Sequence, residues 1–246
     1  MSPDLSAFLF PLLLAYLRVQ ALILMLPALS ERLLSVRLRI ALAVMLAPMA
    51  YALSPPQFSL PTGPAGLAVD AVQELMAGFL AALPARLIAF SLHTASSALA
   101  ATASLSQLIG TGTEAAPHPV GNLLYLAGLA VLMAMGLPMM LIDLIAQSYL
   151  VFPPGGDVVL SEITQNVVAL TARSFVIAML LAAPFILGGL LYQLLTGIVN
   201  RVMPTLPVVF IGAPAIILLA LAGLAFLSPA LLAEWARAVF EEGMWR

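Results

Sequence analysis

The chain has 246 residues, of which 63% are hydrophobic and only 8% are charged. Because a soluble domain carries about a quarter charged residues, this composition excludes a soluble enzyme and predicts an integral membrane protein. Nine arginines stand against eleven acidic residues without forming a basic run, which excludes binding to nucleic acid through a phosphate-binding surface.

Apolar runs divide the chain into predicted helices, since a helix needs about 20 apolar residues to cross a bilayer. The clear runs are Leu5–Leu29, Ile40–Leu53, Leu123–Phe152, Val167–Val199 and Val208–Leu232. The stretch Ala65–Ile109 is too long for one span and contains Pro84, so it is either one bent helix or two segments. The predicted fold class is therefore all-α, with five to seven kinked apolar helices in a single membrane domain of residues 1–246.

Prolines lie inside several of these runs and favour kinked helices. They are Pro48, Pro138, Pro184 and Pro214. Each removes a backbone donor that lipid does not replace, so we expect protein or water beside each break. At the end of the chain, the spacing of Leu231, Trp235 and Val239 predicts an amphipathic surface helix over Leu231–Arg246, with a frayed tail as the alternative.

Five charged residues are flanked on both sides by apolar sequence. They are Arg18, Glu74, Arg86, Asp143 and Arg173. An arginine facing lipid at the centre of a helix costs about 2.5 to 3.5 kcal/mol, so we expect Arg18 to pair with an acid of this chain or of a partner. Glu74 shares a helix face with Asp70 and needs a cation from elsewhere. The alternative is that some of the five, Arg86 first among them, reach the membrane interface instead.

The segment Thr94–Ser104 consists almost entirely of small residues. Such a segment typically allows close packing of helices, and a hydroxylated wall of a water-filled path is the alternative. Signatures of catalysis are missing. His93 and His118 are far apart in the sequence, cysteine is absent, and neither a metal-binding spacing, a nucleophile elbow nor a phosphate-binding loop occurs. We therefore predict no enzymatic activity, no cofactor and no metal site.

Several short motifs occur in a fixed order along the chain. The most distinctive joins two apolar segments and contains Arg201, Pro204, Pro207, Phe210, Gly212 and Pro214. Others are Arg18 with the following arginines and prolines, Glu74-Leu-Met-Ala-Gly78, Gln107-Leu-Ile-Gly110 with His118-Pro119, and Ser148-Tyr-Leu-Val-Phe-Pro153. The ordered set resembles the FliR family of the flagellar export apparatus and its type III secretion counterparts. We expect the Arg201–Pro214 segment to be a structured helix connection.

The resemblance implies a non-enzymatic subunit of the export gate, with a FliP-like N-terminal part and a FliQ-like C-terminal part. Its partners would be FliP and FliQ, with FlhB nearby, in a channel that passes unfolded flagellar proteins across the bacterial inner membrane at the basal body. The implied pore plug comprises Gly110, Thr111, Gly112, Thr113, Glu114, Ala115, Ala116, Pro117, His118, Pro119 and Val120. An ordinary connecting loop is the alternative for this segment.

Three other functions remain as alternatives. One is the homologous gate subunit of an injectisome. A secondary transporter would also use interrupted helices and buried charges, but it would need an internal pseudo-symmetry that the sequence does not display. An intramembrane enzyme would need a nucleophile with a base.

Overall fold

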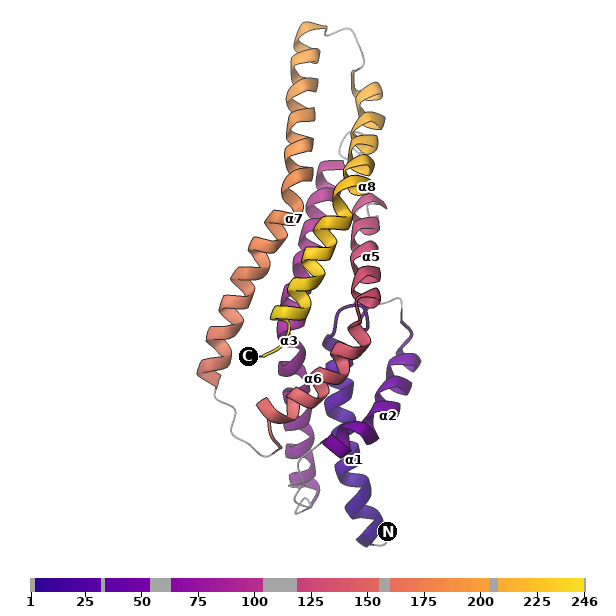
Figure 1. The fold of residues 1–246 in the computed structure, drawn as a ribbon, viewed down its shortest axis with the longest axis vertical. Helices are drawn as coiled ribbons and strands as arrows, with labels where there is room; N and C mark the ends of the chain where they lie inside the picture. Colours follow the sequence, from indigo (N-terminus) through magenta and orange to yellow (C-terminus); the bar gives the residue numbers. More distant parts are fainter. Residues whose placement is uncertain are drawn as a thin grey trace. The chain divides into compact units, whose positions relative to one another are not determined.

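The computed structural model of the chain describes residues 3–31, 34–53, 63–103, 119–154, 160–203 and 208–245. All regular secondary structure within these ranges is helical (Figure 1). The helices are α1 (Pro3–Met25), α2 (Val36–Leu53), α3 (Pro64–Ala103), α5 (Pro119–Ala134), α6 (Leu137–Val151), α7 (Leu160–Val202) and α8 (Val208–Glu242). The predicted all-α class is confirmed.

Most of these helices are suited to a bilayer. Among the described residues, α1, α2, α3, α7 and α8 are each long and apolar enough to cross a membrane. The pair formed by α5 and α6 meets the same criterion as a broken span, which gives up to six. This range agrees with the five to seven apolar helices expected from the sequence.

The apolar run Leu123–Phe152, counted as one segment with an internal proline at Pro138, consists of two helices bent by 67°. Gly136 separates α5 from α6 and has a φ angle of 107°, a left-handed conformation that favours glycine. Pro138 lies in the first turn of α6, where its missing N–H breaks no intrahelical bond. Hydropathy does not register this change of backbone direction, because both sides of the turn are equally apolar.

The other prolines singled out in the sequence lie within continuous helices. Pro48 is inside α2, Pro84 inside α3, Pro184 inside α7 and Pro214 inside α8. Of the two alternatives for Ala65–Ile109, the structure therefore supports one long helix that includes Pro84.

The chain forms two compact units, and several long helices contribute residues to both. The first unit comprises Met1–Ile88, Leu132–Thr171 and Ala238–Arg246, and the second comprises Ala89–Val131 and Ala172–Arg237. In the first unit, α1 packs along α2, and α6 contacts both helices. Its core contains fully buried side chains from α1, α3 and α6, such as Leu22, Ile88 and Leu144.

The second unit is held by close contacts at small residues. A Cβ atom at Gly121 of α5 would lie 2.5 Å from the carbonyl oxygen of Ser96 and 3.0 Å from Cβ of Ala100 in α3. A Cβ atom at Gly189 of α7 would lie 3.1 Å from Cβ of Thr102. The described part of the small-residue segment in α3 therefore serves close helix packing.

The predicted amphipathic surface helix over Leu231–Arg246 was wrong in its placement. Helix α8 continues without a break to Glu242, and Trp235 is only 2% exposed. The indole Nε1–H of Trp235 donates to Oγ of Ser91 at 3.1 Å. The apolar face of this stretch is therefore covered by protein. The sequence did not distinguish the two cases, because the pattern of an amphipathic helix is the same whether a membrane interface or another helix covers it.

Parts of two predicted segments lie outside the described residues. In the predicted plug, the residues outside the described ranges are Gly110–His118, whereas Pro119 and Val120 begin α5. For the predicted helix connection they are Pro204 and Pro207. The other residues of that motif belong to helices, Arg201 to α7 and Phe210, Gly212 and Pro214 to α8.

Candidate functional site

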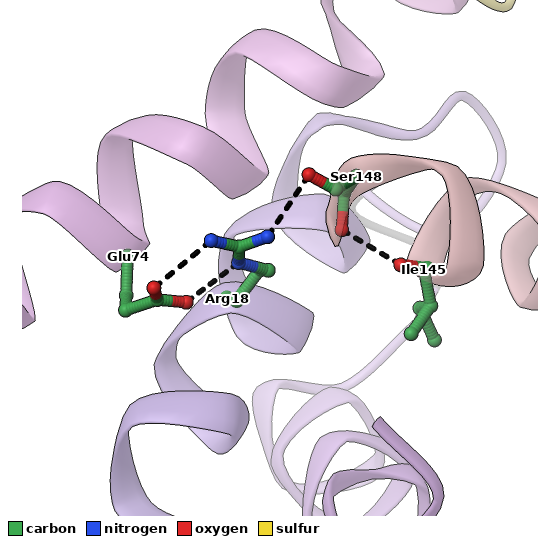
Figure 2. Close-up of polar contacts among 4 residues, drawn as sticks. All are labelled: Arg18, Glu74, Ile145 and Ser148. Carbon is green, nitrogen blue, oxygen red and sulfur yellow. Dashed lines mark hydrogen bonds and ion pairs between the residues drawn. The ribbon is translucent and has the colours of Figure 1, made fainter. Parts of the chain in front are cut away.

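The first unit contains a buried ion pair between α1 and α3. Nε of Arg18 lies 2.6 Å from Oε2 of Glu74, and Nη2 of Arg18 donates to Oε1 of Glu74 at 2.9 Å (Figure 2). The two residues are 1% and 3% exposed. Two parallel charge-assisted bonds are among the strongest polar contacts in proteins. The expectation that Arg18 pairs with an acid and Glu74 with a cation is confirmed.

A third contact joins Arg18 to the end of α6. Nη1 of Arg18 donates to the backbone carbonyl oxygen of Ser148 at 3.0 Å, and this oxygen also accepts the N–H of Phe152 at 3.0 Å. The Ser148 hydroxyl donates to the carbonyl oxygen of Ile145 at 2.7 Å. Because the C-terminal end of a helix carries partial negative charge, it favours the guanidinium at this place.

The aromatic ring of Tyr149 covers one face of the guanidinium. The central carbon of the Arg18 guanidinium lies 4.0 Å from the ring centroid, within cation–π range, and Tyr149 is 3% exposed. Arg18 is therefore surrounded by a carboxylate, a helix end and an aromatic face. Together these groups offset the desolvation that a buried charge would otherwise suffer.

Gly78 allows α3 to approach α1 at this site. It lies one helical turn after Glu74, and a Cβ atom there would clash with the carbonyl oxygen of Arg18 and lie 2.9 Å from Cβ of Ala21. The two helices thus touch through their backbones. This close approach brings the Glu74 carboxylate within direct reach of Arg18. We call Arg18, Glu74, Gly78, Ser148 and Tyr149 the Arg18 cluster.

The other charged residues singled out in the sequence lie elsewhere. Nη1 of Arg86 is 3.5 Å from Oε1 of Glu31 and donates to Oγ of Ser30 at 2.8 Å, and its side chain is 40% exposed. Asp143 and Arg173 are exposed on the chain. These two residues thus do not lie in the interior of this chain. That they contact another subunit or a water-filled lumen stays a prediction.

The Arg18 cluster unites three motifs that are far apart in the sequence. Arg18 belongs to the N-terminal arginine and proline pattern, Glu74 and Gly78 form the second motif, and Ser148 begins the one that ends at Pro153. The sequence did not identify Tyr149 or the Ser148 carbonyl as partners of Arg18. The available signal was the position of Ser148-Tyr149 in an apolar run close to a proline, which indicates a helix end.

The cluster ties helices together and offers little for catalysis, because its carboxylate is already bound by the guanidinium. In the ranges described, no three residues among histidine, cysteine, aspartate and glutamate gather in a way that suits a metal ion. Fold and site together define a helical membrane protein whose helices are fastened by a buried ion pair.

Comparison with known proteins identifies the family. A sequence model of the family described as bacterial export proteins, family 1, matches residues 9–242. The chain is also 29% identical over 218 residues to the flagellar biosynthetic protein FliR of Caulobacter vibrioides, which covers 86% of each chain. The chain therefore belongs to the bacterial export proteins of family 1, and the resemblance to FliR found in the sequence motifs is confirmed.

Proposed function

We propose that this chain is a subunit of the flagellar type III export gate. With FliP-type and FliQ-type subunits, and with an FlhB-type subunit nearby, it forms the channel that passes unfolded flagellar proteins across the bacterial inner membrane. The observation that carries the proposal is the similarity to a flagellar FliR along 86% of both chains. A flagellar relative favours the flagellar system over an injectisome, and membership of an export family argues against a transporter or an enzyme.

The proposal treats residues 1–246 as a single FliR-like domain, with a FliP-like N-terminal part and a FliQ-like C-terminal part. The exposed apolar side chains of α7 and α8 support a place among other membrane subunits. Met179 of α7 is 70% exposed and Phe226 of α8 is 84% exposed, and other large apolar residues of both helices are similarly open. Lipid or neighbouring helices must cover such surfaces.

Copurification tests the proposed gate. The full chain, solubilised in mild detergent from cells that carry its export genes, is expected to elute in a large complex that contains the FliP-type and FliQ-type proteins. Mass spectrometry of the eluted complex identifies them, and an unrelated membrane protein with the same affinity tag serves as control. Elution of the chain alone or as a homodimer would contradict the proposal and favour a transporter.

We also propose that Gly110–Val120 plugs the pore when no substrate passes. Glycine, threonine and alanine dominate its first half, and two prolines restrict its second half, so the segment has little bulk with which to pack. Deleting residues 112–118 is expected to increase ion leakage through the assembled gate without reducing the amount of complex. Conductance of membranes that contain equal amounts of wild-type and deleted complex measures this. Equal conductance would make the segment an ordinary linker.

A further inference from the structure

Pro84 leaves a backbone acceptor in α3 without its usual donor. In an α-helix the carbonyl oxygen of Leu80 would accept the N–H four residues later, at position 84. Proline has no N–H, so this bond does not form although α3 continues through Pro84 as one helix. Pro84 is buried. Since hydrocarbon offers no donor either, the carbonyl oxygen needs a donor from another part of the protein.

Trp245 supplies that donor from the segment that follows α8. Its indole Nε1–H donates to the carbonyl oxygen of Leu80 at 2.8 Å, in a partly buried position. The two residues are separated by 165 positions in the sequence. A tryptophan side chain suits this place, because it combines one strong N–H donor with a large apolar body.

Two further contacts fix the segment beside Pro84. At Gly243, a Cβ atom would clash with the carbonyl oxygen of Val239 and would lie 2.8 Å from Cε of Met140 and 3.1 Å from Cα of Ala85, so the backbone here lies close to α3 and to the tip of a side chain of α6. The ring of Trp245 meets the ring of Phe152 edge to face, with centroids 6.0 Å apart and planes at 88°. Phe152 follows α6, and its N–H shares the Ser148 oxygen with Arg18.

We propose that Gly243–Trp245 is a strap that replaces the hydrogen bond removed by Pro84 and fastens α3 to the end of α6. Gly243 allows the close approach to α3, and Trp245 donates to the Leu80 carbonyl oxygen. The ring of Trp245 also contacts Phe152, whose N–H bonds to the same Ser148 oxygen as Arg18. While the strap is docked, the carbonyl oxygen of Leu80 in α3 has a hydrogen-bond donor. When it is released, a partly buried carbonyl in an apolar surrounding loses its partner, so docking of the strap stabilises the helical course of α3 through Pro84.

A double-mutant cycle tests this role in the purified full-length chain in detergent. Trp245→Phe keeps an aromatic ring and removes the donor, and it is expected to lower the melting temperature by on the order of 5 °C. In a Pro84→Ala background the alanine N–H bonds to the Leu80 oxygen, so the same change is expected to lower the melting temperature by less than about 2 °C. Equal losses in both backgrounds would show that Trp245 acts through packing alone and would overturn the proposal.

A second measurement does not depend on the folding of the Pro84→Ala chain. The sequence has two tryptophans, so Trp235→Phe leaves Trp245 as the only one, and its emission can be excited selectively at a wavelength that the five tyrosines do not absorb. Acrylamide is expected to quench Trp245 several-fold more slowly than it quenches free indole in the same micelles. Adding Gly243→Val, whose side chain would meet the carbonyl oxygen of Val239 as well as Met140 and Ala85, is expected to displace the segment and make the quenching of Trp245 fast. Quenching of Trp245 as fast as that of free indole before Gly243 is changed would contradict a docked strap.

Discussion

Replacing Arg18 with leucine is expected to destabilise the chain by about 3 to 5 kcal/mol, because the change leaves the Glu74 carboxylate buried without its cation. The variant also loses the contact with the Ser148 carbonyl and with the Tyr149 ring. Thermal unfolding of the purified chain measures the loss. The yield of the copurified complex and the motility of cells that carry the variant are both expected to fall.

The chain offers a matched control for this change. Arg237 and Glu234 form an ion pair of the same 2.6 Å length, but their side chains are 58% and 72% exposed. Arg237→Leu is therefore expected to cost less than about 1 kcal/mol, since water replaces the lost partner. The double change Arg18→Leu with Glu74→Leu is expected to recover part of the stability, because no isolated charge remains buried. Equal stability of Arg18→Leu and Arg237→Leu would contradict a structural role for the buried pair.

Substituting alanine for Gly78 is expected to destabilise the chain by about 1 to 3 kcal/mol, although alanine is the better helix former. The added methyl group would meet the backbone of Arg18, and α1 and α3 would have to separate. Separation lengthens the distance between Arg18 and Glu74. The Arg18→Leu change is therefore expected to cost less in the Gly78→Ala background than in the wild type, which the same unfolding measurement reveals.

Gly197 in α7 provides the control for Gly78, because a Cβ atom there would meet no atom beyond its own helix backbone within 4 Å. Gly197→Ala is expected to leave stability unchanged or raise it by up to about 1 kcal/mol, as helix propensity alone predicts. If Gly78→Ala proved as harmless as Gly197→Ala, close backbone contact between α1 and α3 would not be what positions the ion pair.

The pairing of Arg18 with an acid could be predicted because the cost of an unpaired charge in an apolar run is large and depends only on position along the helix. That argument also identified Glu74 as an acid in need of a cation. It did not match the two residues to each other. The match depends on how closely α1 and α3 approach. Gly78 permits a close approach, but the sequence does not say that the helix packed against it is α1.

The errors came from features that the apolar pattern does not record. Hydropathy treated Leu123–Phe152 as one run, because the break consists of a backbone angle at Gly136 and not of a polar residue. The pattern around Trp235 indicated one apolar face, but the same face fits a membrane interface and a buried helix contact. Pro84 shows in the sequence that one backbone donor of α3 is missing, but the sequence does not show that Trp245, from the segment after α8, donates to the Leu80 oxygen in its place.

Arg18 reaches Ser148 through a main-chain oxygen, which every amino acid supplies. Substitutions at position 148 therefore leave this acceptor in place, whereas insertions and deletions in α6 displace it. One added residue between Gly136 and Ser148 would rotate the following carbonyl groups by about 100° around the helix axis and shift them by about 1.5 Å. The hydrogen bond from Arg18 thus constrains the length of α6 rather than the identity of residue 148, because a charge on another helix is matched to one turn of its backbone.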